Sequence, residues 1–358
     1  MGVRVFALLV ILITPARAAS RCELRGKPWI EGRIRGTRGM LRATDARRGE
    51  EIEAFVAAPG RLNGRAVVFG EGRGRVPWSD CGPIDIAWRR VEPRMEHTST
   101  PSPNPGVAAY SDAVVFGPKH GQWIGYDTIE YFESPLEGSG WRLTLRTAQP
   151  SDPGLAARAG GLGVMRLAAT LHTETQEART AGEDAAFRYS FRAGDDFLGW
   201  LTSFFNVPYV FASAGKGARS QAERYVGADC ADILVAALRR AGHRELEYTS
   251  VAGLIDRLER VGAPVVLGKQ PTALRFGRDV HVGDLVALDY VGYEDLPRDW
   301  DHIVVVVEDR GPGGKPDGVL GPEDLVADSG SAAGLHYAPL GEQGLIKIQV
   351  LRVRRPRG

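Results

Sequence analysis

The chain has few cysteines and no surplus of either charge. It holds three cysteines in 358 residues, and 45 lysines and arginines balance 44 aspartates and glutamates. A formal net charge of +1 gives no global attraction to nucleic acid or to an anionic membrane, so neither is an expected partner. The cysteines are isolated from one another and no set of cysteines and histidines has zinc spacing. The sequence therefore predicts neither a metal site nor a cofactor.

Long apolar runs are absent beyond the N-terminus. There, Arg4 precedes the apolar run from Val5 to Ile13, and Ala16 and Ala18 are the small residues that a signal peptidase reads. We expect residues 1–18 to be a signal peptide. The run is too short to span a bilayer comfortably, and no other segment is a transmembrane candidate. The sequence thus predicts an exported protein, periplasmic or extracellular, with no transmembrane segment after cleavage; its oligomeric state is open.

Export makes a disulfide chemically reasonable, and three cysteines can form one disulfide and leave one free thiol. Cys22 and Cys81 both lie in the N-terminal half of the chain, whereas Cys230 is alone in the second half. We predict that Cys22 pairs with Cys81. Cys230 is then the single free thiol.

Residues 19–190 are expected to form an all-β N-terminal region. Short apolar or alternating runs are separated by Gly, Pro and Asp, which is typical of a sandwich or an open barrel. A Pro- and Ser-rich stretch at 98–106 is a loop or a linker between two sub-modules. The expected strands lie near residues 52–56, 66–69, 84–88, 113–116, 128–132 and 141–145.

Residues 191–358 are expected to form an α+β domain, because helical patterns come first and strands follow. Helices are predicted from Asp195, after Cys230, and over residues 250–261, where apolar side chains recur at helical spacing. The predicted strands cover residues 280–289, 300–307, 325–330 and 346–351.

Cys230 lies where a loop turns into a helix. Apolar residues recur after it with a helical period, and Gly242 stands where a C-terminal cap belongs. A thiol in the first helical turn faces unpaired N–H groups and the positive end of the helix dipole, and both favour the nucleophilic thiolate. The alternative is a buried cysteine acting as a small hydrophobe. The flanking Asp229 and Asp232 favour chemistry, since charged neighbours are unusual around a core cysteine.

A cysteine nucleophile needs a base and a polar group that orients the base. His302 is the first choice as base, because it heads a valine-rich strand and follows Asp301. His336 is the second choice. Asp328, at the end of the next strand, is the candidate third member, although Asp328-Ser329-Gly330 is equally well explained as a simple turn.

Four blocks between residues 195 and 351 resemble successive blocks of the NlpC-type cysteine peptidases, which are papain-like enzymes of the bacterial cell wall. The blocks are a Pro-Tyr segment, an Asp-Cys helix start, a Gly-Asp-Leu-Val strand and a strand headed by histidine. They cover Asn206 to Phe211, Gly227 to Val235, Val282 to Val286 and Asp301 to Val305.

The resemblance implies a papain-like domain in which Cys230 is the nucleophile, His302 the base and Asp328 the third residue. Tyr209 would be the tyrosine that lies near the nucleophile. The implied activity is hydrolysis of an amide bond through a thioester acyl-enzyme, and the implied substrate is a peptidoglycan stem peptide, often cut next to a γ-linked D-glutamate.

The chain departs from this family at three places, one of which is the long, charged loop from Tyr290 to Trp300 before the histidine. Ala231-Asp232 replaces the usual Ser-Gly after the Asp-Cys pair, and Phe211-Ala212-Ser213 replaces the usual Trp-Gly-Gly. A bulky Asp232 close to the nucleophile would exclude ordinary stem peptides or select a different amide. Two alternatives remain open: a transglutaminase-like cysteine peptidase that acts on protein, and a non-catalytic envelope binding module that keeps the fold.

Overall fold

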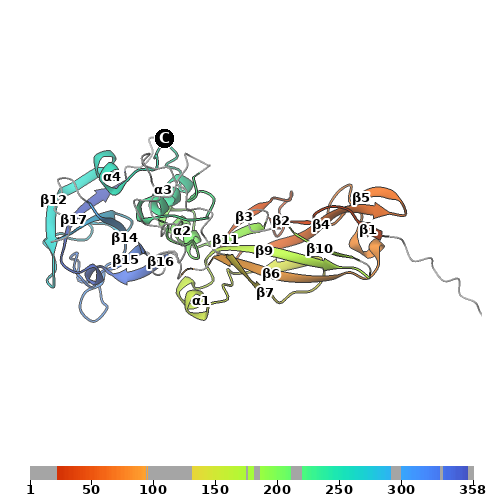
Figure 1. Cartoon of the computed structure of the whole chain (residues 1–358). Coiled ribbons are helices and arrows are strands. Elements are labelled where there is room, and N and C mark those ends of the chain that lie inside the picture. The colour runs from red at the N-terminus through yellow and green to blue at the C-terminus, as the bar shows by residue number, and fades with distance from the viewer. Residues whose placement is uncertain are drawn as a thin grey trace, which may run out of the picture.

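The computed structural model is an elongated molecule in which strands predominate (Figure 1). It describes residues 22–93, 95, 131–174, 176–180, 186–210, 220–291, 300–330 and 334–353. These residues form three sheets and four α-helices, which is a mixed α+β architecture. The predicted signal peptide, the Pro- and Ser-rich stretch at 98–106 and the expected strand at 113–116 lie outside the described residues.

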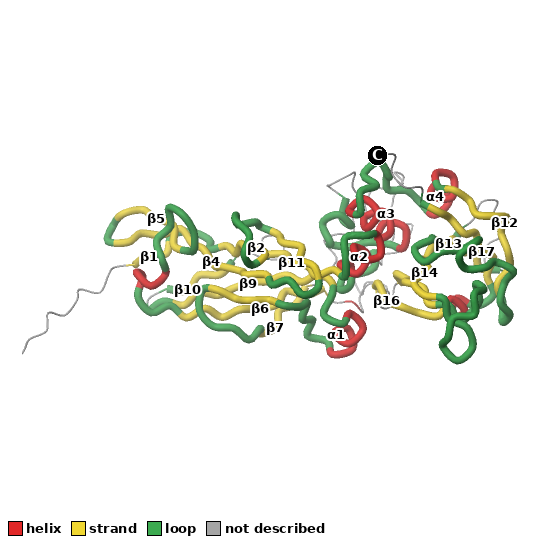
Figure 2. The backbone as a smooth tube through the Cα atoms, turned by 180° about the vertical axis from the view of Figure 1, so that it is seen from behind, coloured by secondary structure: helices red, strands yellow, loops and turns green. Residues whose placement is uncertain are grey.

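Two of the sheets occupy one end of the molecule and run along its long axis (Figure 2). The first sheet is built around the long strand β4 (Ile52–Leu62). Each of its other strands pairs with β4: β1 (Cys22–Leu24), β2 (Trp29–Ile34), β5 (Arg65–Phe69) and β8 (Arg142–Leu145). The second has the order β3-β11-β9-β6-β7, with β10 beside β9. Its strands are β3 (Ala43–Arg47), β6 (Asp85–Pro93), β7 (Tyr131–Pro135), β9 (Gly163–His172), β10 (Glu177–Arg179) and β11 (Phe187–Arg192).

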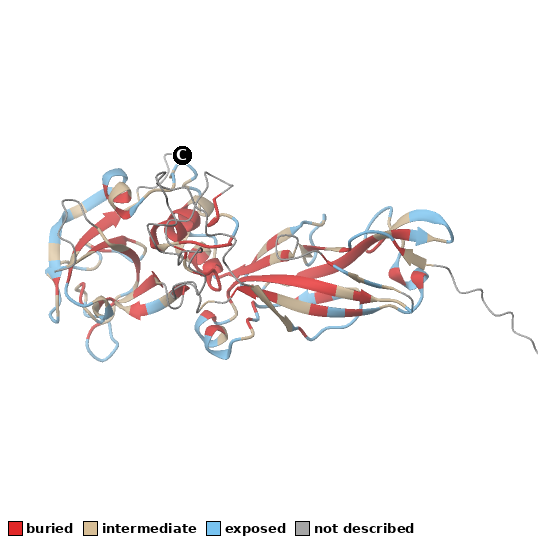
Figure 3. Ribbon diagram, viewed as in Figure 1, coloured by how far each residue is buried: buried red, intermediate tan, exposed pale blue. Residues whose placement is uncertain are grey.

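These two sheets pack against each other around a shared apolar core, as the continuous buried strands in Figure 3 indicate. The two sheets approach closely at Gly32 of β2, where a Cβ atom would collide with the ring of Phe187 on β11. The absence of a side chain at Gly32 thus lets the sheets approach.

The expectation of an all-β N-terminal region is wrong in one respect. Helix α1 (Pro153–Ala159) interrupts the strands, and a short 3-10 helix, η1 (Trp78–Cys81), precedes β6. Local signals explain α1: Asp152 caps its first turn by accepting a hydrogen bond from the Leu155 N–H at 2.6 Å, Pro153 starts it, and Gly160 ends it in the left-handed conformation.

The predicted disulfide joins β1 to the end of η1. Cys22 and Cys81 are bonded, with their Cα atoms 5.1 Å apart, and this confirms the predicted pairing. Cys230 is the free cysteine. The bond ties the beginning of the first sheet to the segment that enters the second.

The third sheet lies at the other end of the molecule and has the order β12-β17-β13-β14-β15-β16. Its neighbouring strands are antiparallel. The strands are β12 (Glu259–Leu267), β13 (Leu285–Tyr290), β14 (His302–Glu308), β15 (Leu325–Gly330), β16 (Gly334–Pro339) and β17 (Ile346–Arg352). The remaining elements are α2 (Phe197–Leu201), α3 (Cys230–Arg240), α4 (Val251–Arg257), η6 (Thr202–Phe204) and η8 (Leu340–Gln343).

Both faces of this sheet are buried at β14, which explains the unbroken valine run in that strand. Successive side chains of a strand point to opposite faces. Ile303 and Val305 belong to the core that contains helix α3, whereas Val304 and Val306 belong to a second apolar cluster. The sequence between 302 and 307 is therefore apolar throughout instead of alternating.

The expected helix over residues 250–261 is too long. Helix α4 ends at Arg257, and Glu259 begins β12. Pro264 lacks the N–H that a helix needs, and Gly262 takes a positive φ of 68°, so the segment after Arg257 is better suited to an irregular edge strand. Among the described residues, no helix is long and apolar enough to cross a membrane.

Candidate active site

Cys230 is the first residue of α3, as the sequence pattern predicts. Asp229 precedes the helix, and its carboxylate accepts a hydrogen bond from the backbone N–H of Asp232 at 2.7 Å. At the other end Gly242 has a φ of 118°, and the N–H of His243 reaches the carbonyl of Leu238 at 3.0 Å. Strong caps at both ends thus fix the helix, and they fix the Cys230 thiol at its positive end.

His302 lies between Cys230 and Asp328. Its Nε2 is 2.6 Å from Oδ1 of Asp328, and its side chain also hydrogen bonds with the Cys230 thiol. Because Asp328 uses Nε2, Nδ1 is the nitrogen that remains for the thiol. The carboxylate, the imidazole and the thiol therefore form one hydrogen-bonded triad. Its two outer members, Cys230 and Asp328, are 98 positions apart in the sequence.

The electrostatic environment within this triad favours a charged imidazole. Burial lowers the pKa of His302, but the charge of Cys230 and the hydrogen bonds with Asp328 and Cys230 outweigh burial and raise this pKa to about 10. His302 is thus an imidazolium at neutral pH, hydrogen bonded with the Asp328 carboxylate. Asp328 is the complementary partner. Burial raises its pKa, but the hydrogen bond and charge of His302 outweigh burial and lower the pKa below its ordinary value, so the carboxyl stays ionised.

The Pro-Tyr segment lies directly beside the start of the Cys230 helix. Val210 N–H donates to the carbonyl of Ala228 at 3.1 Å, and Ala228 N–H donates to the carbonyl of Pro208 at 3.2 Å. Burial first, and then the charges of Cys230, Asp229 and Asp328, raise the pKa of the Tyr209 hydroxyl. Tyr209 is therefore a neutral hydrogen-bond donor close to the thiol.

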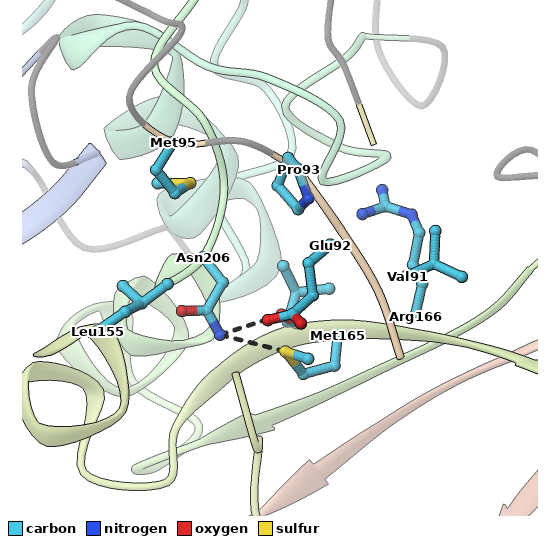
Figure 4. Close-up of a pocket in the computed structure, with 9 residues that line it drawn as sticks. Val91, Glu92, Pro93, Met95, Leu155, Met165, Arg166 and Asn206 are labelled. Atoms are coloured by element: carbon cyan, nitrogen blue, oxygen red, sulfur yellow. Dashed lines mark hydrogen bonds between the residues drawn. The ribbon is translucent and has the colours of Figure 1, made fainter. Parts of the chain in front are cut away.

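Asn206 anchors this segment to the second sheet. Its backbone is left-handed, with a φ of 71°, and its side-chain amide donates to the carbonyl of Val164 at 3.2 Å. Figure 4 shows Asn206 at the wall of a small pocket, with Met165 and Glu92 nearby. Cys230 does not line this pocket. Strand β9 thus holds the backbone that leads to Tyr209.

The other predicted site residues have different surroundings. The Asp301 carboxylate accepts the backbone N–H of Tyr290 at 2.8 Å, so it braces the end of β13. His336 pairs with Asp328 in the β15–β16 register, but its Nε2 is 4.0 Å from Oδ2 of Asp328. Its Nδ1 lies 3.0 Å from the carbonyl of Gly334. The geometry accordingly favours His302 over His336 as the partner of the thiol.

Asp232 is buried, with 5% of its surface exposed, and its charge acts on Tyr248. Burial, then the charges of Glu223 and Asp232, raise the pKa of the Tyr248 hydroxyl. Among the described residues, the charges that shift the pKa of His302 are those of Cys230 and Asp328. The charge of Asp232 is therefore not one of the causes of the raised pKa of His302.

Sequence reasoning missed two residues of the site, Gln343 and Tyr290. Gln343 Nε2 donates to Oδ2 of Asp328 at 2.9 Å, and the Tyr290 hydroxyl donates to Oε1 of Gln343 at 2.7 Å. Gln343 lies in a Glu-Gln-Gly turn that carries no catalytic pattern. Tyr290 ends β13 two residues after Leu288, which is the register partner of His302, so only the strand pairing reveals its position.

No group of three or more His, Cys, Asp or Glu side chains that could hold a metal ion occurs in the part of the chain that the structure describes. Comparisons with protein-family models, with curated proteins and with solved structures found no match to this chain.

Proposed function

We propose that the chain is an exported cysteine peptidase or amidase that hydrolyses an amide bond in the cell envelope, with peptidoglycan stem peptides as the substrate class. The observation that carries this proposal is the triad of Cys230, His302 and Asp328, in which one imidazole is hydrogen bonded with a thiol and a carboxylate. A thiol at a helix start beside an imidazolium is the arrangement that stabilises a nucleophilic thiolate. The domain is proposed to be papain-like, on the order of the four sequence blocks.

In the proposed mechanism, the Cys230 thiolate attacks the carbonyl carbon of the amide. The N–H groups of Cys230 and Ala231 have no acceptor within the helix, because they belong to its first turn. They would stabilise the oxyanion of the tetrahedral intermediate. His302 then gives its proton to the leaving amine, and the C–N bond breaks to leave a thioester on Cys230.

Water completes the reaction. His302, now neutral, accepts a proton from water as the water oxygen attacks the thioester carbonyl, and the C–S bond breaks to release the carboxylic acid and the thiolate. Asp328 keeps the imidazole oriented through both steps and stabilises its charged form. The proposed reaction steps need no redox partner.

The disulfide between Cys22 and Cys81 supports export, because disulfides persist in oxidising compartments. The predicted signal peptide supports the same location. The proposed location is the periplasm or the outside of the cell.

The test is digestion of purified peptidoglycan by the mature protein beside its Cys230→Ala variant, with the products read by mass spectrometry. We expect new stem-peptide fragments from the wild type, and a rate at least about a thousandfold lower from the variant. His302→Ala should lose a similar factor, whereas His281→Ala, which changes an exposed histidine, should keep the wild-type rate. Equal fragments from wild type and Cys230→Ala would remove Cys230 from the mechanism and overturn the proposal.

A further inference from the structure

A chain of hydrogen bonds ends on the carboxylate that orients His302. The Tyr290 hydroxyl donates to Oε1 of Gln343 at 2.7 Å, and Nε2 of Gln343 donates to Oδ2 of Asp328 at 2.9 Å. The other carboxylate oxygen, Oδ1, is 2.6 Å from Nε2 of His302. Each oxygen of Asp328 therefore has its own partner, and the two partners act on opposite sides of the carboxylate.

The backbone fixes the positions of Tyr290 and Gln343, the two residues that lead to Asp328. Tyr290 is the last residue of β13, and its N–H donates to the Asp301 carboxylate at 2.8 Å. Gln343 is the last residue of η8, and Gly344 follows with a φ of 84°, a conformation that glycine adopts without strain. Tyr290 and Gln343 thus extend from two tight, well-defined positions, and neither side chain is exposed.

The direction of the hydrogen bonds matters, because a glutamine amide can present either its oxygen or its NH₂ group. Only the orientation with NH₂ toward Asp328 stabilises the ionised carboxylate. A protonated Tyr290 selects that orientation, since it offers its O–H to the amide oxygen. Burial first, and then the charges of Asp328 and Cys230, raise the pKa of Tyr290, so its hydroxyl keeps the proton that it donates.

Asp328 also has a competing partner. Nε2 of His336 lies 4.0 Å from Oδ2, the same oxygen that Gln343 binds. A carboxylate rotates easily about its last bond, because that torsion is broad. Without Gln343, Asp328 could turn Oδ2 toward His336, and Oδ1 would then lose its alignment with His302.

We propose that Tyr290 and Gln343 are positioning residues: they hold Asp328 in the orientation that keeps His302 directed at Cys230. Neither touches the reacting atoms. This inference rests on the proposed function, because the orientation of His302 has a purpose only where Cys230 reacts as a nucleophile. It adds two residues to the site, both from segments without a recognisable motif.

The test is the rate of alkylation of Cys230 by iodoacetamide between about pH 4 and pH 10, in mature protein with its disulfide intact. The variants are Gln343→Ala and Tyr290→Phe, and peptide mass spectrometry reads the modified cysteine. On the acid side of the profile, where the rate rises with the thiolate fraction, we expect Gln343→Ala to lower the rate about tenfold, which corresponds to a displacement of the profile by about one pH unit. Tyr290→Phe should lower it about threefold, because it removes one indirect hydrogen bond.

The matched control is Tyr189→Phe, which removes a buried hydroxyl with no hydrogen-bond partner among the described residues. Its pH profile should equal that of the wild type. A purely structural role for Gln343 would lower the melting temperature and leave the shape of the profile unchanged, so an unshifted profile in Gln343→Ala would overturn the inference. If Gln343→Ala does not fold, the profile of Tyr290→Phe decides in the same way.

The experiment separates this inference from the proposed function. If Cys230 of the folded wild type reacts at pH 6 no faster than it does in unfolded protein, the proposed function fails. If the wild type reacts fast and both variants match it, only the positioning role fails.

Discussion

His302 is the residue with the largest electrostatic consequence for the site. Its pKa of about 10 lies well above the ordinary value of 6.5, so its proton is bound more tightly in the folded than in the unfolded chain. Such a group stabilises the fold fully below its unfolded pKa, and the stabilisation is lost as the pH rises through the folded pKa. The relevant window therefore runs from about pH 6.5 to about pH 10.

We accordingly predict that His302 makes the free energy of unfolding fall between pH 6.5 and pH 10. Urea denaturation at several pH values should show a fall in the wild type that is absent, or much smaller, in His302→Gln. His281→Gln changes an exposed histidine outside the site and should keep the wild-type slope. Identical slopes in wild type and His302→Gln would contradict the assignment of a raised pKa to His302.

At the scale of elements, helix α3 gives Cys230 its position and its electrostatic environment. All its residues from Cys230 to Leu238 are buried, so the helix is fixed by packing as well as by its caps. Strands β14 and β15 supply the partners, because their ends bring His302 and Asp328 to the start of the helix. A shift of one residue in either strand would turn its side chain to the opposite face of the sheet.

The cap at Asp229 is a direct test of how firmly the helix start is held. We predict that Asp229→Ala lowers the free energy of unfolding by about 1 kcal/mol, because the N–H of Asp232 loses its acceptor. Asp229→Asn should recover most of this loss, since asparagine also caps helices well. Chemical denaturation of the three proteins measures both effects; an Asn variant as unstable as the Ala variant would show that charge, and not capping, is what Asp229 contributes.

At the scale of the whole molecule, a cluster of stacked rings and cations joins the second sheet to the end of helix α3. Two guanidinium groups lie over the Tyr225 ring, with the Arg188 carbon 4.7 Å and the Arg240 carbon 4.5 Å from its centre. Asp45 of β3 pairs with Arg188 of β11 and lies 3.6 Å from Arg240 at the end of α3. The sheet is thereby tied to the helix that carries Cys230.

We predict that Asp45→Asn costs about 3 kcal/mol of stability, because it leaves the largely buried guanidinium group of Arg188 without its carboxylate and removes one of the two carboxylates beside Arg240. Burial opposes ionisation, but Arg188, Arg240 and Ser190 lower the pKa of Asp45 to about 2. This stabilisation is thus present above about pH 4 and is lost as the pH falls toward 2.

The control for Asp45→Asn is Glu51→Gln, which breaks surface pairs with Arg35 and Arg146, whose side chains are 63% and 69% exposed. It should cost less than about 1 kcal/mol, because exposed ion pairs are screened by water. Urea denaturation at pH 7 compares the two variants. Equal losses would mean that the buried cluster adds nothing beyond an ordinary surface pair.

The sequence by itself determined the features that depend on neighbouring residues. The start of the helix at Cys230, its end at Gly242 and the strands after residue 280 follow from capping and from apolar patterns, which are local. The pairing of Cys22 with Cys81 followed from cysteine arithmetic, because only these two remain when Cys230 is set apart. Local context also made Cys230, His302 and Asp328 candidates before their distances were known: Cys230 starts a helix, His302 begins a valine-rich strand, and Asp328 ends the strand that follows.

Only the tertiary structure decided which side chains meet. Gln343 at the end of η8 donates to Asp328, and Tyr290 at the end of β13 donates to Gln343; no local pattern encodes contacts between positions 290, 328 and 343. Pairing with β17 also places residues 259–261 in the edge strand β12, although their periodicity predicted that they would continue the preceding helix. The physical reason is the same in each case: local signals fix backbone conformation within a few residues, whereas strand pairing and burial set the distances between residues far apart in the chain.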